Sequence, residues 1–241
     1  MEPIEVFRRY ELKYILEEQQ YRELMNLVNR YMVDDEFHLS SIYNIYYDTS
    51  TYLLIRNSLD KPVYKEKVRV RSYRSVNENG QVFAELKKKF EDVVYKRRIE
   101  TDWKTAESIM CQKQEFKDTQ IGREVSETVH FYKTLRPVMF LGYEREAYAG
   151  MDDPQLRVTF DRNIVYRTGN IQLRRSTEDR KLIEDGKVLM EVKSTGAIPL
   201  WMTHFLDRNR IYRTSFSKYG SAYMNEYEAG RIQIWFGCHN Y

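Results

Sequence analysis

The residues best suited to chemistry in this chain are the lysines and arginines between Lys65 and Lys89. The stretch reads KEKVRVRSYRSVNENGQVFAELKKK, in which two alternating runs of charged and apolar residues flank the turn-like segment NENG. This pattern predicts a β-hairpin. Because side chains alternate between the two faces of a strand, each strand would carry one charged and one apolar face. Arginine forks and lysine ammonium groups on such a face suit the binding of phosphate groups.

Other predicted strands repeat this alternation of charged and apolar residues. Glu11 and Lys13 share a face in YELKY, and Glu191 and Lys193 share a face in LMEVKS. A plain solvated sheet is the alternative interpretation, because charged strand faces usually point to water. Several matching charged faces favour instead a sheet curled around a wet, charged lumen, with helices covering its apolar side.

The residues on the proposed inward faces are of both signs. The cations are Arg9, Lys13, Arg69, Arg71, Lys87, Lys89, Arg145, Arg157 and Lys193. The acids are Glu11, Glu85, Asp161 and Glu191. Cations at this density cannot lie in a dry interior, because each unpaired buried ion costs several kcal/mol, so we expect water and a bound anion. The carboxylates are hard oxygen ligands that suit Mg²⁺ or Mn²⁺ beside phosphate.

The elements that must position these residues can be traced along the chain. Besides the hairpin, strands are predicted over residues 5–16, 38–47, 93–101, 136–149, 155–161 and 187–195. Helices are predicted over residues 17–31, 51–58, 102–110, 120–135, 199–210 and 217–229. Residues 163–186 are predicted as a loop-rich excursion with short irregular strands. The pattern predicts an α+β fold, an eight-stranded antiparallel β-barrel with helices packed outside, as one domain over residues 1–241.

Composition limits the other classes of function. The chain has 241 residues, of which 42% are hydrophobic and 31% charged, and its net charge is only +3. An anion site must therefore come from local clustering of cations. Neither a signal peptide nor a bilayer-spanning apolar run is recognised, which predicts a cytoplasmic location. Cys111 and Cys238 have no metal-ligand spacing and fit a reducing compartment, with one disulfide as the alternative.

Nine short motifs occur in an order that is familiar from one protein family. They are YELKY, IYYDT, KVRVRSY, FAELKKK, VVYKRR, YEREAY, LRVTFDRNI, LMEVKS and FSKYG, over about residues 5–222. Together they resemble the VTC-type polyphosphate polymerase domains, a branch of the triphosphate tunnel metalloenzymes, which include the CYTH proteins. The resemblance implies an eight-stranded tunnel and transfer of the terminal phosphate of ATP to inorganic polyphosphate, with Mn²⁺ or Mg²⁺. It also implies that the domain works beside a membrane-protein partner.

The resemblance implies roles for residues at matching positions. Arg69 and Arg71 would hold phosphates, Glu191 matches the metal-binding glutamate, and Lys218 would lie near one tunnel mouth. The expected catalytic residues are Lys13, Arg69, Arg71, Lys87, Arg145, Arg157 and Lys193. The expected substrate-binding residues are Arg9, Lys89, Arg97 and Lys218. The expected metal ligands are Glu191, Glu11, Glu85 and Asp161.

Two positions qualify these assignments. The CYTH hydrolases carry Glu-x-Glu-x-Lys on their first strand, whereas this chain has Arg9 in place of the first glutamate. Loss of a metal ligand there favours the VTC branch over a CYTH-type hydrolase. Arg97 and Arg98 are adjacent, so only one of them can face inward, and parity favours neither; Arg97 is taken as the candidate.

Several alternatives remain open at this point. The same tunnel could hydrolyse inorganic or nucleoside triphosphate, or bind polyphosphate or inositol polyphosphate without turnover. Nucleic-acid binding is disfavoured by the low net charge and the interleaved glutamates. Glu11 with Lys13, and Glu85 with Lys87, could be plain ion pairs, and Asp161 could be a turn residue. No Walker loop or kinase catalytic loop occurs, and phosphoryl transfer needs neither a serine nor a cysteine nucleophile.

Overall fold

A computed structural model describes residues 10–60, 62–77, 79–91, 93–111, 114–116 and 119–232. Arg9 and Cys238, which the sequence analysis singled out, lie outside the described residues, as does the tail from residue 233. Within the described part of the chain, no helix is long and apolar enough to cross a membrane.

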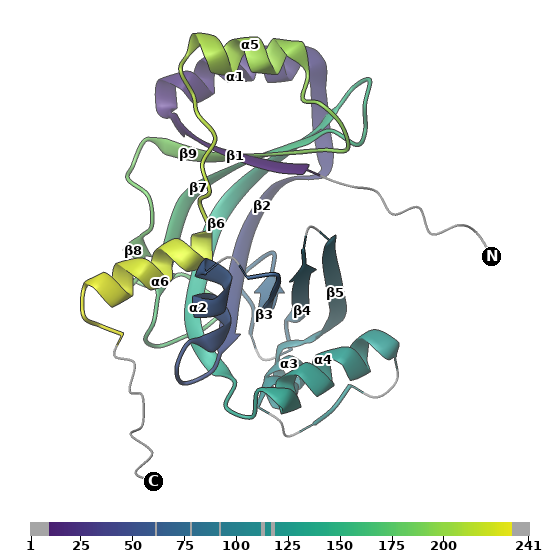
Figure 1. The fold of residues 1–241 in the computed structure, drawn as a ribbon, viewed down its shortest axis with the longest axis vertical. Coiled ribbons are helices and arrows are strands. Elements are labelled where there is room, and N and C mark those ends of the chain that lie inside the picture. Colours follow the sequence, from purple (N-terminus) through teal and green to yellow (C-terminus); the bar gives the residue numbers. More distant parts are fainter. Residues whose placement is uncertain are drawn as a thin grey trace, which may run out of the picture. The chain divides into compact units, whose positions relative to one another are not determined.

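The elements follow the predicted order closely (Figure 1). The strands are β1 (Tyr10–Glu17), β2 (Met32–Asp48), β3 (Tyr64–Ser72), β4 (Gln81–Phe90), β5 (Val93–Asp102), β6 (Arg136–Gly150), β7 (Arg157–Arg167), β8 (Arg180–Lys181) and β9 (Lys187–Ser194). The helices are α1 (Glu18–Tyr31), α2 (Leu53–Leu59), α3 (Trp103–Met110), α4 (Gln120–Phe131), α5 (Leu200–Arg208) and α6 (Lys218–Glu228). The strand predicted over residues 155–161 is longer in the structure, because β7 continues to Arg167, and the short strand β8 lies in the excursion predicted over residues 163–186.

The strands form one sheet in the order β1-β9-β7-β6-β2-β3-β4-β5, with the short strand β8 paired to β7. The predicted antiparallel α+β class is confirmed. Among the described residues the predicted closure into a barrel is not observed, because β1 and β5 end the hydrogen-bonded order. The outer edge of β1 has another partner: Tyr14 forms a bridge with Arg213, and the Thr214 amide donates to the Lys13 carbonyl at 2.8 Å.

The chain divides into two compact units, each made of three segments. Unit 1 takes its described residues from Met1–Ser41, Tyr143–Ile164 and Ile183–Phe216, and unit 2 from Ile42–Gly142, Val165–Leu182 and Ser217–Tyr241. The strands β2, β6 and β7 each contribute residues to both units. The organisation as a single domain stays a prediction.

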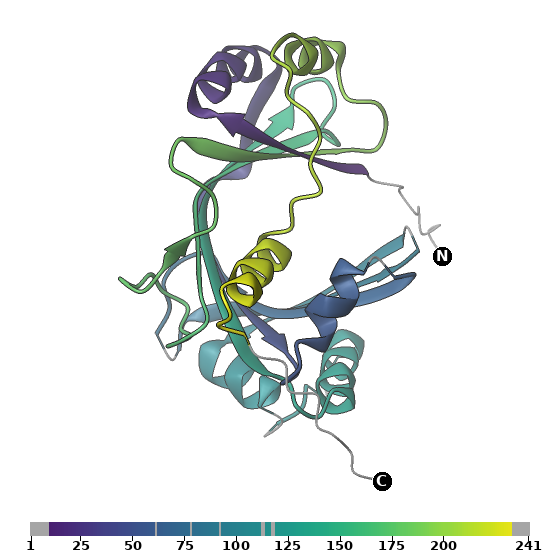
Figure 2. The ribbon, with the colours of Figure 1, turned by 60° about the vertical axis from the view of Figure 1, so that its left-hand side comes forward.

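Unit 1 buries the apolar face of its strands under two helices. Figures 1 and 2 show α1 and α5 lying side by side over β1 and β9. Leu24 and Val28 of α1 pack in one core with Met202 of α5 and with Met190 and Val192 of β9. The alternation in LMEVKS therefore predicted the buried face of β9 correctly.

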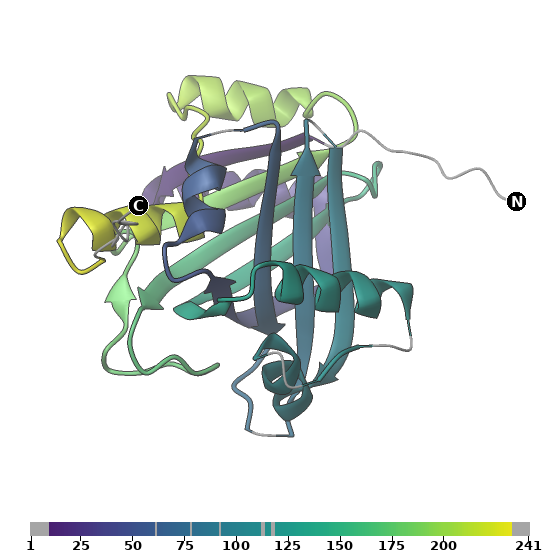
Figure 3. The same cartoon turned by 60° about the horizontal axis from the view of Figure 1, so that its bottom comes forward.

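Unit 2 buries the apolar face of the predicted hairpin. The strands β3 and β4 pair antiparallel, as expected, and Val68 and Val70 lie in one core with Ala84. Helices α3 and α4 cover this face, contributing Met110 and Val125 to the same core. In Figure 3, α4 crosses β3, β4 and β5. Helices therefore cover the apolar side of the sheet in this unit, and the charged side chains of both strands lie on its other face.

A buried carboxylate joins two helices of unit 2 to the end of β2. Asp48, which is 0% exposed, accepts hydrogen bonds from the amides of Leu54 and Ile55 at 2.9 Å each. The same carboxylate accepts from the Tyr219 hydroxyl of α6 at 2.9 Å. The aspartate of the motif IYYDT thus satisfies free amides in the first turn of α2.

Substitution of Asp48 by alanine removes all of these acceptors. We expect Asp48→Ala to lower the free energy of unfolding by about 3 kcal/mol, because buried amides and a hydroxyl lose a charged partner. Urea denaturation measures the change. The control is Asp60→Ala at the exposed C-terminal end of α2, which should change stability by less than about 0.5 kcal/mol. Equal effects of the two substitutions would contradict the assignment.

Candidate functional site

The charged face of unit 2 is built from neighbouring strands in fixed register. Arg69 of β3 lies opposite Glu85 of β4, which lies opposite Arg98 of β5. The next row along the strands holds three lysines, Lys67, Lys87 and Lys96. Like charges directly opposite each other destabilise a sheet. A bound polyanion would remove this cost.

Glu85 holds the two predicted phosphate-binding arginines. Its carboxylate lies 2.6 Å from Arg69 Nη2 and 3.8 Å from Arg71 Nε. Burial raises the pKa of Glu85, but the charges of Arg69 and Arg71 outweigh burial and leave that pKa below its ordinary value. Arg71 Nε also donates to the buried Asn44 Oδ1 at 2.9 Å. The guanidinium groups are therefore oriented before any ligand arrives, and Glu85 is placed as their partner.

Tyr46 of β2 completes this face, and the sequence analysis did not select it. Its hydroxyl accepts from Arg69 Nη1 at 3.1 Å, and its ring stacks on Tyr219 with centroids 4.3 Å apart. Burial raises the pKa of Tyr46, but the charges of Arg69, Lys67 and Arg71 outweigh burial and lower that pKa to about 8. The pKa of Tyr46 therefore depends on the positive charges of this face.

The N-terminus of α6 adjoins the same row of cations in unit 2. Ser217 caps α6 by accepting from the Gly220 amide at 3.2 Å, and Lys67 Nζ donates to its hydroxyl at 3.3 Å. Lys218 is the first residue of the helix. The positive end of the helix dipole therefore adds to the cations of β3.

The charged face of unit 1 centres on Glu191 of β9. Three cations surround its carboxylate: Lys13 Nζ at 3.7 Å, Arg145 Nη2 at 3.4 Å and Lys193 Nζ at 4.0 Å. Glu191 is 7% exposed. Lys13 also lies 3.3 Å from Glu11. The face thus brings together both glutamates and three of the expected catalytic cations of this unit.

Arg145 is fixed by a fully buried acid. Its Nε and Nη2 donate to the two oxygens of Asp161 at 2.6 and 2.7 Å. Burial lowers the pKa of the Arg145 guanidinium, but the Asp161 carboxylate outweighs burial and raises that pKa well above its ordinary value. Asp161 lies inside β7, so the alternative of a strand-end turn is wrong. The two hydrogen bonds identify Asp161 as the ion-pair partner of Arg145.

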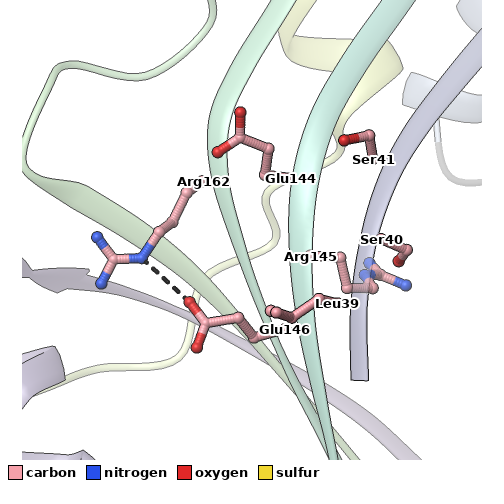
Figure 4. A pocket seen from close by; sticks show the side chains of 7 residues that line it. All are labelled: Leu39, Ser40, Ser41, Glu144, Arg145, Glu146 and Arg162. Carbon is pink, nitrogen blue, oxygen red and sulfur yellow. Dashed lines mark ion pairs between the residues drawn. The ribbon is translucent and has the colours of Figure 1, made fainter. Parts of the chain in front are cut away.

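A pocket of about 290 Å³ in unit 1 reaches Arg145 from the side of β2 (Figure 4). Its lining comes from β2, β6 and β7 and comprises Leu39, Ser40, Ser41, Glu144, Arg145, Glu146 and Arg162. Glu146 accepts from the Tyr21 hydroxyl at 2.8 Å and lies 3.6 Å from Arg162 Nε. Glu144 and Glu146 flank Arg145 in β6, so strand alternation points them away from Glu191. Glu146 contacts Tyr21 of α1 and Arg162 of β7.

Comparisons with known proteins place the chain in a family. The family model described as the VTC domain matches residues 8–227. The chain belongs to the VTC-domain family. No curated protein matches the sequence. The fold is similar to that of a candidate adenylate cyclase from Bacillus halodurans, with a TM-score of 0.52 and 12% identity over 87% of this chain and 95% of that chain.

A second solved structure, the PH1819 protein from Pyrococcus horikoshii, matches with a TM-score of 0.42. Its identity to this chain is 11%, and the match covers 90% of this chain and 99% of that one. The family assignment confirms the expected VTC-type domain, and the similarity to the first structure supports the antiparallel fold.

One of the expected arginines, Arg97, lies away from the charged face. Arg97 points to the helix-covered side, where its Nε lies 2.6 Å from Glu124 of α4. Arg98 lies on the charged face instead, 3.9 Å from Glu85 and with its guanidinium 3.5 Å from the centre of the Phe83 ring. The choice of Arg97 was wrong for this face, because α4 supplies a carboxylate that parity could not indicate. Arg157, at the start of β7, forms an ion pair with Asp35.

A titration tests the cationic field around Tyr46. We expect Tyr46 to ionise at a pH of about 8, and we expect Tyr46→Phe to abolish that transition in the ultraviolet absorbance of phenolate. Because the folded-state pKa lies below the ordinary value of 10, ionisation stabilises the fold above about pH 8, and this contribution is lost as pH falls through that value.

The same transition should alter anion binding. Above about pH 8 the phenolate adds a negative charge beside Arg69, Lys67 and Arg71, so tripolyphosphate affinity should fall relative to the Tyr46→Phe variant. Parallel pH profiles of the two proteins would contradict the assignment.

Proposed function

We propose that this VTC domain transfers the terminal phosphate of ATP to the end of an inorganic polyphosphate chain, with a divalent metal. The observation that carries the proposal is the row of Lys67, Lys87 and Lys96 beside Arg69 and Arg71, an arrangement that a string of phosphates would neutralise. Membership of the VTC-domain family supports this substrate class. The reaction forms a new phosphoanhydride bond, and ADP leaves as the other product.

On the unit 1 face, the cations around Glu191 would bind the phosphate oxygens. Lys13, Arg145 and Lys193 lie within 4.0 Å of that carboxylate, and the two lysines can turn toward an incoming anion. Asp161 keeps the Arg145 guanidinium in place through two short hydrogen bonds. These groups would stabilise the charge that develops as the terminal P–O bond breaks.

On the unit 2 face, Arg69 and Arg71 would hold phosphates of the nucleotide or the chain. Glu85 orients both guanidinium groups, and Lys67 and Lys218 contribute further positive charge. The carboxylate of Glu85 is committed to three arginines, because Arg98 also lies within 3.9 Å. This geometry supports Glu85 as a positioning residue, and not as a metal ligand.

The residues present fit a divalent metal that binds together with substrate. Among the described residues, no group of three or more histidine, cysteine or acidic side chains could hold a metal ion. Magnesium characteristically uses one or two carboxylates and completes its shell with water and substrate phosphates. Glu191 is the proposed ligand, with Glu11 beside it. The metal would supply neutralisation of the phosphate charge.

Two other functions fit the same residues. With water as the acceptor, the faces would support hydrolysis of inorganic or nucleoside triphosphate, and without turnover they would bind polyphosphate or inositol polyphosphate. The match to a candidate adenylate cyclase has too little identity to choose among nucleotide reactions. The cytoplasmic location and a membrane-protein partner stay predictions from the sequence and the family.

Product analysis separates the three functions. We expect the purified protein, incubated with ATP and Mn²⁺ or Mg²⁺, to form long phosphate chains that gel electrophoresis and phosphorus NMR resolve. Release of free phosphate alone would favour the hydrolase. No change in ATP, together with tight binding of tripolyphosphate, would favour a binding module and contradict the proposed transfer.

Two variants should separate binding from turnover. Glu191→Gln keeps the shape of the side chain and removes its charge, so turnover should be lost while metal-free tripolyphosphate binding is retained. Arg69→Ala removes a charge-assisted contact and should weaken binding by about 1.5–3 kcal/mol. Calorimetry and a turnover assay on the same preparations measure both effects.

Matched controls are available at exposed positions. Glu184→Gln and Arg22→Ala remove the same charges from side chains that are 80% and 75% exposed. Neither should change binding or turnover. Normal, metal-dependent turnover by Glu191→Gln would show that Glu191 is not the ligand.

A further inference from the structure

One buried hydroxyl on the unit 1 face has no hydrogen-bond partner among the described residues. It is Oγ1 of Thr159, a residue of β7 that is 6% exposed. A buried polar group that makes no hydrogen bond destabilises the folded state, and native proteins satisfy the great majority of such groups. A ligand that supplies the missing partner would account for a threonine at this position.

Strand register places Thr159 on the charged face. Its neighbours Val158 and Phe160 are both 0% exposed and pack in the core, so Thr159 points to the opposite side of β7. It lies directly across from Glu191 of β9, which lies directly across from Lys13 of β1. A single row across three strands thus carries the lysine, the carboxylate and the hydroxyl.

The surroundings indicate which partner the hydroxyl would take. The three cations around Glu191 attract anions, and Arg145 is anchored to Asp161, two residues from Thr159 on the same face of β7. The oxygens of a phosphate are acceptors only, whereas a hydroxyl has a hydrogen to donate. The branched side chain of threonine also restricts χ1, so the hydroxyl is held in place before the ligand binds.

We propose that Thr159 is a substrate-binding residue whose Oγ1 donates a hydrogen bond to a phosphate oxygen held by Lys13, Arg145 and Lys193. The inference rests on the proposed function, since it adds a neutral contact to the same phosphate site. A neutral donor adds direction without adding charge, so it distinguishes a correctly placed phosphate oxygen from a general anion.

The test compares Thr159→Val with Thr159→Ser by calorimetric titration with tripolyphosphate in the absence of metal. Valine matches the shape of threonine and removes the hydroxyl, so affinity should fall at least about tenfold, which corresponds to ~1.4 kcal/mol, near the lower end for a hydrogen bond to a charged phosphate oxygen. Serine keeps the hydroxyl and should restore binding to within about twofold of the original protein.

Thermal unfolding without ligand supplies the second readout. Thr159→Val removes an unsatisfied hydroxyl, so its Tm should equal or exceed that of the original protein. The matched control is Thr128→Val: Thr128 is 7% exposed, and its hydroxyl donates to the Glu124 carbonyl at 2.9 Å. That variant should show a lower Tm and unchanged tripolyphosphate affinity.

The outcomes separate this inference from the proposed function. Unchanged metal-free affinity in Thr159→Val overturns the inference alone, and a loss confined to titrations with Mn²⁺ overturns it in favour of a metal contact. A lower Tm of ligand-free Thr159→Val also overturns it, because the hydroxyl would then have a structural partner. No binding of tripolyphosphate by the original protein overturns both.

Discussion

Buried and half-buried carboxylates allow cations to gather on the faces of this sheet. Glu191 lies within 4.0 Å of Lys13, Arg145 and Lys193. Glu85 plays the same part for Arg69 and Arg71. Without these acids, like charges at neighbouring strand positions would repel one another at close range. With them, the cations are held in position and can still exchange a carboxylate oxygen for a phosphate oxygen.

This exchange links the fold to the proposed chemistry. A carboxylate released by its lysines and arginines on phosphate binding would be free to hold a divalent metal in the proposed reaction. Asp161 differs from Glu191 in this respect, because it is 0% exposed and holds Arg145 through two short hydrogen bonds. Asp161 therefore fixes Arg145, whereas Glu191 is placed to exchange its lysine and arginine partners for a metal ion.

Much of this arrangement could be predicted from strand alternation alone. Val68 and Val70 alternate with Arg69 and Arg71, and this alternation was sufficient to predict which face of β3 is buried, because the core selects the apolar face of each strand. The short helix predicted over residues 51–58 is likewise present as α2, with Asp48 accepting from the amides of its first turn. Family resemblance added the expected substrate class, which neither composition nor periodicity contains.

Other features depend on contacts that are distant in sequence. Tyr46 joins the charged face because it stacks on Tyr219 and accepts from Arg69, and neither contact leaves a local pattern. Arg97 lies on the helix-covered face of β5, where it pairs with Glu124 of α4. The sheet stays open at β1, whose outer edge pairs with residues 213–214. The sequence around Thr159 indicates only a threonine in a strand, and the pairing of β7 with β9 is needed to place it opposite Glu191.

The central claim is that these faces bind a string of phosphates through their cations. The most direct measurement is calorimetric titration of the full chain with tripolyphosphate at increasing salt concentration. Since the contacts are between charges, we predict tight binding at low ionic strength that weakens steadily as salt screens them. Binding that does not depend on salt, or no binding at low salt, would contradict the account.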